Sequence, residues 1–156
     1  MKKLLFTIIA GTALLLNTTN ASAQNYKNGV GLAVDFGEGT TFAGPHIKHF
    51  FSSTGAINGE VLFGGSTTLL QAMYQYHGTI TGASGLKWYV GGGPSIQLYD
   101  GGSSFYLVPM AGLDLKFGGA PIAASFDWRP RAYLGDNPFI DNFNAGRFGL
   151  GFRYTF

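Results

Sequence analysis

The sequence predicts an all-β protein, an eight-stranded antiparallel up-and-down transmembrane β-barrel. After residue 27, apolar residues alternate with small or polar ones, which is the pattern of strands with one apolar face. Eight such segments follow one another, each about ten residues long and bounded by turn residues. Charged residues make up only 12% of the chain, about half the usual share, whereas a water-soluble domain carries more charge on its surface.

The amino terminus carries the pattern of a secretory signal. Lys2 and Lys3 precede an apolar run of about 13 residues and the small-residue sequence Ala21-Ser22-Ala23. This run is too short for a transmembrane helix, which needs roughly 20 apolar residues. We therefore expect residues 1–23 to be removed as a signal peptide and residues 24–156 to form one outer-membrane barrel domain.

Charge and cysteine content exclude several classes of protein. Removal of the signal peptide lowers Lys+Arg from 10 to 8, against 8 Asp+Glu, so no basic surface points to nucleic acid as a partner. The chain has no cysteine, which excludes a disulfide framework and a cysteine-anchored lipoprotein. We therefore expect the fold to be stabilised by the barrel alone.

The first two strands are predicted at about residues 28–36 and 41–51, on either side of the turn Glu38-Gly39-Thr40. Their apolar faces are Val30, Leu32, Val34 and Phe36, then Ala43, Pro45, Ile47 and Phe51. Their opposite faces are Gly29, Gly31, Ala33 and Asp35, then Gly44, His46 and Lys48. The second strand is the less regular of the two.

The third and fourth strands are predicted at about 56–64 and 68–80, after the turn Ser52-Ser53-Thr54-Gly55. Their apolar faces are Ile57, Val61 and Phe63, then Leu70, Ala72, Tyr74 and Tyr76. Their opposite faces are Asn58 and Glu60, then Gln71, Met73, Gln75 and His77. The period of two is kept throughout both segments.

The fifth, sixth and seventh strands are predicted at about 86–99, 104–117 and 121–130. Their apolar faces are Leu86, Trp88, Val90, Ile96 and Leu98, then Phe105, Leu107, Leu113, Leu115 and Phe117, then Ile122, Ala124, Phe126 and Trp128. Their opposite faces are Lys87, Tyr89, Ser95, Gln97 and Tyr99, then Tyr106, Met110, Asp114 and Lys116, then Ser125, Asp127 and Arg129. In the fifth strand, Gly91-Gly92-Gly93-Pro94 predicts a bend or a β-bulge.

The eighth strand, 147–156, alternates most clearly and ends on an aromatic residue. Its apolar face is Phe148, Leu150, Phe152, Tyr154 and Phe156. This segment resembles the terminal strand of bacterial outer-membrane β-barrels, which the barrel-insertion machinery reads. The resemblance implies that Phe152, Tyr154 and Phe156 form the insertion signal and that this machinery is a partner.

Over its mature length the chain resembles the small eight-stranded outer-membrane proteins of the OmpA-domain and OmpX type, also grouped as an opacity or porin-like family. The motif Ser125-Phe126-Asp127-Trp128-Arg129-Pro130 is similar to the penultimate strand of small barrels from Bacteroidetes. The resemblance implies a location in the bacterial outer membrane, in contact with its lipid and lipopolysaccharide. Three of the four outer connections are very short, which is unlike OmpX-type proteins and argues against adhesion or a broad receptor role.

A soluble, lipocalin-like barrel would bury the apolar face and expose the other one. That other face is rich in glycine, alanine and serine with isolated charges, whereas a face in water would carry dense lysine, glutamate and threonine. Large aromatic residues also lie near the ends of the apolar faces, as in the interfacial girdles of membrane barrels. These residues are Trp88, Phe105, Trp128, Phe148, Tyr154 and Phe156.

The interior of an eight-stranded barrel is just wide enough to be filled by side chains. The charges that face it nearly balance, and isolated buried charges are costly, so we expect them to pair and to plug the lumen. The predicted network is Asp35, Lys48, Glu60, Lys87, Asp114, Lys116, Asp127, Arg129, Arg147 and Arg153. The expected groups are Asp35, Asp127, Arg129 and Arg147 near the outer end, Lys48 with Glu60, and Lys87 with Asp114 and Lys116.

No catalytic, cofactor or metal site is expected. His46 and His77 face inward from strands that are not adjacent, His49 faces outward, and no zinc-type spacing occurs. An enzyme acting on lipopolysaccharide acyl chains would need a serine, a histidine and a carboxylate within hydrogen-bond reach. The serines expected in the outer turns, away from the histidines, are Ser66, Ser103 and Ser104. Such an enzyme and a narrow channel remain the alternatives.

The connection of about residues 131–145 is the one long connection. Connections of this length are usually functional or disordered, and the apolar content here favours function. The residues concerned are Tyr133, Phe139, Ile140 and Phe143. We expect a lid over the barrel mouth or a binding site for a protein partner. The predicted function class is a structural or interaction membrane protein, for example an accessory subunit of a larger outer-membrane complex.

Overall fold

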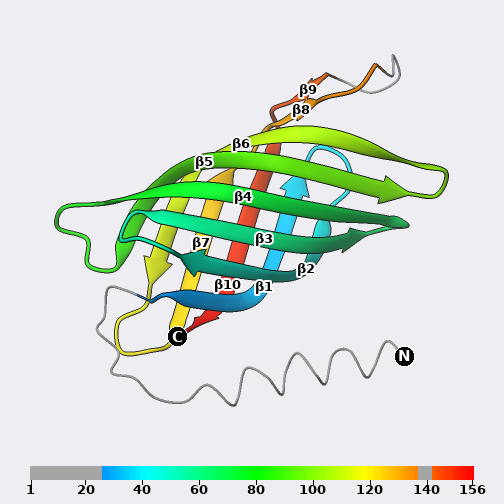
Figure 1. The fold of residues 1–156 in the computed structure, drawn as a ribbon. Helices are drawn as coiled ribbons and strands as arrows, with labels where there is room; N and C mark the ends of the chain where they lie inside the picture. The colour runs from blue at the N-terminus through cyan, green and yellow to red at the C-terminus, as the bar shows by residue number, and fades with distance from the viewer. Residues whose placement is uncertain (1–25, 137–141) are drawn as a thin grey trace, which may run out of the picture.

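Eight strands of one sheet form a closed barrel (Figure 1). The computed structural model describes residues 26–136 and 142–156. The wall strands are β1 (Asn28–Gly37), β2 (Phe42–Phe50), β3 (Gly55–Gly64), β4 (Thr67–Thr79), β5 (Leu86–Tyr99), β6 (Gly102–Lys116), β7 (Ile122–Trp128) and β10 (Arg147–Thr155). They pair antiparallel in the order β5-β4-β3-β2-β1-β10-β7-β6, and β6 pairs with β5 to close the ring. The predicted all-β, eight-stranded antiparallel barrel is confirmed.

The barrel has two rims, which we call the terminal rim and the hairpin rim. The terminal rim holds Tyr26, Phe156 and the turns 51–54, 80–85 and 117–121. The hairpin rim holds the turns 38–41, 65–66 and 100–101 and the connection between β7 and β10. At the terminal rim the amide of Asn28 donates to the carbonyl of Phe156 (2.8 Å) and the amide of Phe156 donates to the carbonyl of Asn28 (2.9 Å), so the pairing with β1 continues one residue beyond β10.

Side chains alternate between the outer surface and the lumen along the wall strands, as a period of two requires. The outer surface is apolar: Leu32 exposes 61% of its area and Phe152 exposes 57%. The lumen is charged: Asp35 is 0% and Arg153 is 1% exposed. The barrel therefore has its apolar face outside and its charged face inside, which is the reverse of a soluble barrel.

The run Gly91-Gly92-Gly93-Pro94 lies in the middle of β5, where the sequence predicts a bend or a β-bulge. The pairing of β5 with β4 and with β6 keeps the same register on both sides of this run, so no residue is inserted and no bulge forms. The glycines instead allow the backbones of neighbouring strands to approach closely. A Cβ at Gly91 would lie 2.0 Å from the carbonyl oxygen of Tyr74, a distance that no side chain tolerates.

The connection predicted at 131–145 is shorter in the structure, because its two ends form the strands β8 (Arg131–Tyr133) and β9 (Phe143–Asn144). β8 pairs with β6 in the same register as β7 does, so it continues β7 beyond Pro130. Proline has no N–H to donate, which explains the interruption between the two strands. β8 and β9 pair with each other and extend past the rim (Figure 1). Segments this short show no readable alternation in the sequence.

Candidate functional site: the charged lumen

One cluster of buried charges lies toward the hairpin rim and centres on Arg129, which follows β7 and is 2% exposed. Its Nη1 donates to Oε2 of Glu60 (2.8 Å). Its Nε and Nη2 donate to the two carboxylate oxygens of Asp127 at 2.5 and 2.9 Å. Arg129 therefore joins β7 to β3, and Glu60 and Asp127 depend on it for their opposite charge. Bonds of this kind, between charged partners, are the strong ones.

The same cluster contains Asp35, which is surrounded by three arginines and is fully buried. Arg131 donates to its Oδ2 (2.7 Å), and Arg147 donates to its Oδ1 from Nε (2.8 Å) and Nη2 (2.6 Å). Arg129 lies 3.8 Å from Oδ2, and Gln71 on β4 donates to the same oxygen (3.2 Å). Asp35 thus connects the neighbouring strands β1 and β10 with β4 on the other side of the lumen.

A second cluster lies toward the terminal rim and centres on Asp114 of β6. Lys48 of β2 donates to its Oδ2 (2.6 Å), and Arg153 of β10 donates to the same oxygen. The hydroxyl of Tyr26 also donates to it (3.2 Å) and accepts from Nε of Arg153 (2.9 Å). Tyr26 precedes β1; burial raises the pKa of its hydroxyl above the ordinary value, and the charge of Asp114 acts in the same direction. The hydroxyl therefore stays protonated and serves as a donor.

Two of these ion pairs span the full diameter of the barrel. β2 and β6 are four places apart around the ring of eight, and Lys48 and Asp114 connect them. β3 and β7 are also four places apart, and Glu60 is joined to Arg129 directly after β7. Between the two clusters, the hydroxyl of Tyr89 donates to Asp127 (2.5 Å). Side chains thus cross the lumen at several levels.

The structure places the ten charged residues predicted to face the lumen at buried positions, except for Lys87, which is half-buried. It brings Asp35, Arg129 and Arg147 together with Asp127, as expected for the outer end. Lys87, Asp114 and Lys116 lie together as expected, because Lys87 is opposite Asp114 in the strand register and all three line one hollow, but neither lysine forms an ion pair with Asp114. The expected pair of Lys48 and Glu60 does not form. Lys48 pairs with Asp114 and not with Glu60. Lys116 donates to two backbone carbonyls of the β6–β7 turn, those of Phe117 (3.1 Å) and Ala120 (2.5 Å).

The predicted network did not include several participants, among them Tyr26, Gln71, Tyr89 and Arg131. Arg131 was assigned to a loop, and Tyr26 lies before the first predicted strand. The alternation placed the side chains of Gln71 and Tyr89 on the inward face, so the sequence predicted their orientation. It did not predict which residues on other strands they would bond to.

Among the described residues, no serine is hydrogen-bonded to His46 or His77. Both ring nitrogens of His46 are buried without a hydrogen-bond partner, and His77 contacts Oε1 of Gln75 through Nε2 (3.3 Å). Ser103 and Ser104, expected in a turn, belong to β6, and Ser104 is buried against the hydroxyl of Tyr99 (3.2 Å). Within the described ranges, no group of three or more His, Asp or Glu residues is placed to hold a metal.

The residues expected to form a lid or partner site fall into two sets. The ring of Tyr133 on β8 packs against that of Tyr106 on β6, tilted by 51° with centroids 5.5 Å apart, and Phe143 of β9 exposes 57% of its area. Phe139 and Ile140 lie outside the described residues. The side chains of Phe152, Tyr154 and Phe156, expected to form the insertion signal, are exposed on the outer wall.

Fold and site together define a class: a closed eight-stranded β-barrel with an apolar exterior and an ion-paired interior. No family model, curated protein or solved structure matches the chain. In the part of the chain that the structure describes, no helix is long and apolar enough to cross a membrane.

Proposed function

We propose that this protein is exported to a bacterial outer membrane, where its eight strands cross the bilayer and it acts as a structural or interaction protein with a plugged lumen. The observation that carries the proposal is the reversed polarity of the barrel wall. Large apolar side chains such as Leu32 and Phe152 are exposed outside, while Asp35 and Arg153 are buried inside. Such a surface is unfavourable in water and suits hydrocarbon.

Closure of the sheet supports the same proposal. A strand edge in lipid would leave backbone N–H and C=O groups without hydrogen bonds, so only helices and closed barrels span membranes. Pairing of β1 with β10 and of β5 with β6 leaves the wall without an edge. The wall also carries Trp88, Trp128 and Tyr154 near strand ends, where membrane barrels place their aromatic girdles.

The first expected result concerns heat-modifiability. Purified in detergent, the protein should migrate faster on a cold gel than after boiling, because a closed barrel resists the denaturing detergent until it is heated. As a control, the boiled and cooled sample should stay at the slower position unless it is refolded. A protein that remains monomeric in buffer without detergent after removal of residues 1–23 contradicts the proposal.

We propose that side chains plug the lumen because two ion pairs span its diameter, Lys48 with Asp114 and Arg129 with Glu60. A hydrated solute would have to separate these buried charges and would leave Lys48 and Glu60 without an ion-pair partner among the described residues, which is costly. With the lumen filled, the outer wall and the paired strands β8 and β9 offer surfaces for contacts with a protein partner. This supports an interaction role and gives no support to a channel.

The second expected result follows from the plug. In planar bilayers the wild-type protein should show no stable unitary conductance of porin size. The double variant Glu60→Ala with Arg129→Ala truncates both side chains of one ion pair that spans the lumen. It should raise the frequency of conducting events, provided that the cold-gel migration shows a folded barrel. Steady porin-like conductance from the wild-type protein contradicts the plugged lumen.

A further inference from the structure

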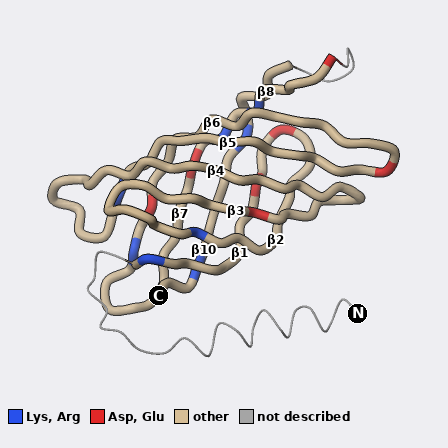
Figure 2. Tube along the Cα trace, viewed as in Figure 1, with Lys and Arg blue, Asp and Glu red and all other residues tan. Residues whose placement is uncertain are grey.

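The two rims of the barrel differ in charge (Figure 2). Toward the hairpin rim, carboxylates and arginines nearly balance within the Arg129 and Asp35 cluster. Toward the terminal rim, Asp114 is the one side-chain carboxylate among the described residues, and five cations lie at the same ends of the strands. These cations are Lys27, Lys48, Lys87, Lys116 and Arg153. The C-terminal residue Phe156 also lies at this rim, but none of the described lysines or arginines forms an ion pair with its carboxylate.

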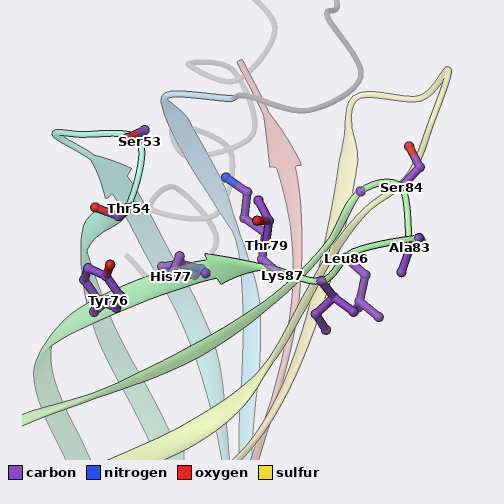
Figure 3. A pocket seen from close by; sticks show the side chains of 13 residues that line it. Ser53, Thr54, Tyr76, His77, Thr79, Ala83, Ser84, Leu86 and Lys87 are labelled. Atoms are coloured by element: carbon purple, nitrogen blue, oxygen red, sulfur yellow. The ribbon is translucent and has the colours of Figure 1, made fainter.

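This basic rim is hollowed. A hollow of about 360 Å³ lies between the turn 51–54 and the start of β5, and its charged lining residues are Lys27, Lys87, Lys116 and the carboxylate Asp114. A second hollow of about 860 Å³ adjoins it and lies between the turns 51–54 and 80–85 (Figure 3). The two hollows share Ser53, Gly85 and Lys87 as lining residues. Lys87 thus stands at the junction of both spaces.

Lys87 has no carboxylate partner among the described residues. It lies opposite Asp114 in the pairing of β5 with β6, but that carboxylate is taken by Lys48 and Arg153. Its Nζ lies 5.5 Å from the centroid of the Phe50 ring. Lys87 therefore lines both hollows without an ion pair to any described carboxylate.

The larger hollow adds a second, independent feature next to Lys87. His77 lines this hollow, is 1% exposed and has an Nδ1 with no hydrogen-bond partner in the described protein. A buried polar atom without a partner is costly, so His77 favours a polar group in the space that it lines. Ser53 and Thr54 add hydroxyl groups to the same wall.

We propose that the terminal rim is a binding site for a phosphate group, with Lys87 as its principal contact, Lys27 and Lys116 beside it in the smaller hollow and His77 in the adjoining larger one. Lysine ammonium groups bind phosphate as point charges, and the three lysines outnumber the one carboxylate of the smaller hollow, that of Asp114, so the hollow keeps a net positive charge. This inference goes beyond the proposed structural role; its lipid form rests on the proposed membrane location, and its free-anion form does not. The phosphate is either a free anion or the phosphodiester of a lipid headgroup, and the experiment distinguishes these sources.

The first arm of the experiment tests free phosphate. The folded protein in a zwitterionic detergent is titrated with inorganic phosphate at constant ionic strength, and binding is followed by calorimetry. We expect saturable binding by the wild type and at least tenfold weaker binding by Lys87→Gln. The second arm compares the thermal unfolding midpoint in nanodiscs of phosphatidylglycerol and of phosphatidylcholine, and the headgroup source predicts that phosphatidylglycerol raises the midpoint of the wild type but not of Lys87→Gln.

A charge-matched control distinguishes a direct contact between Lys87 and phosphate from an effect of the protein's net charge. Asp100 is exposed in the turn between β5 and β6 at the opposite rim, so Asp100→Asn combined with Lys87→Gln restores the wild-type net charge. The double variant should bind as weakly as Lys87→Gln, and Asp100→Asn alone should bind like the wild type. Cold-gel migration verifies that each variant is folded.

The outcomes decide the source as well as the site. Binding of inorganic phosphate that depends on Lys87 supports a free anion, and a Lys87-dependent effect seen only with phosphatidylglycerol supports a lipid headgroup. If neither arm shows an effect that depends on Lys87, or if the charge-matched double variant binds like the wild type, the proposed site is wrong.

Discussion

Replacing Arg129 by methionine is expected to destabilise the folded barrel by about 3–5 kcal/mol, because it leaves buried carboxylates without their shared cation. Glu60 and Asp127 each lose a charged hydrogen bond of 2.9 Å or less, and Asp35 loses a cation 3.8 Å away. Methionine keeps much of the volume of the side chain, so the loss reports the charge more than a cavity. The measurement is reversible urea unfolding in detergent micelles, followed by tryptophan fluorescence.

The control for this variant is Asp100→Asn, which removes a charge from an exposed turn. Its free energy of unfolding should stay within about 0.5 kcal/mol of the wild type, as is usual for surface sites. An Arg129→Met barrel that loses less than about 1 kcal/mol would show that the carboxylates around Arg129 are hydrated or protonated, and would count against the ion-paired lumen.

Lys48 and Asp114 are expected to show an energetic coupling across the barrel. Asp114→Asn alone leaves Lys48 and Arg153 facing each other without a carboxylate and should cost about 3–5 kcal/mol of unfolding free energy. In a double-mutant cycle with Lys48→Met, the coupling energy should be about 1–3 kcal/mol, because the two groups form a buried hydrogen-bonded pair. Urea unfolding of the four proteins provides the measurement.

A second cycle provides the comparison. Lys87 lies opposite Asp114 in the strand register but forms no ion pair with it. The cycle of Lys87→Met with Asp114→Asn should therefore give a coupling below about 0.5 kcal/mol. Equal couplings in the two cycles, or a larger one for Lys87, would mean that Asp114 pairs along the wall and not across the lumen.

The wall strands were predictable because burial on one side imposes a period of two on segments about ten residues long. In the last strand, Phe148 to Phe156 keep this period without a break, and the structure follows it. β8 and β9 were not predictable, since a strand of two or three residues carries no period. Pro130 was the one signal near them, and it reads equally well as the end of a strand or as an interruption within one.

Which charges face the lumen could also be predicted, but most of their partners could not. Lys48 was expected to pair with Glu60 because adjacent strands place the two close together. The long side chain of Lys48 instead reaches Asp114, four strands away around the ring. Pairing across a lumen depends on the tilt and stagger of the whole barrel, which one strand's sequence does not contain.

The seam between β1 and β10 also has a consequence for how the protein folds. Asp35 and Arg147, which hold this seam together in the lumen, are 112 positions apart in the chain. Contacts between such distant residues form slowly, because the chain between them must be ordered first. The barrel cannot close before its last strand is available, and until then Asp35 has none of the charge partners contributed by β7–β10. We therefore expect closure to be a late and post-synthetic step, with the carboxylate of Asp35 kept in water until the final strand is in place.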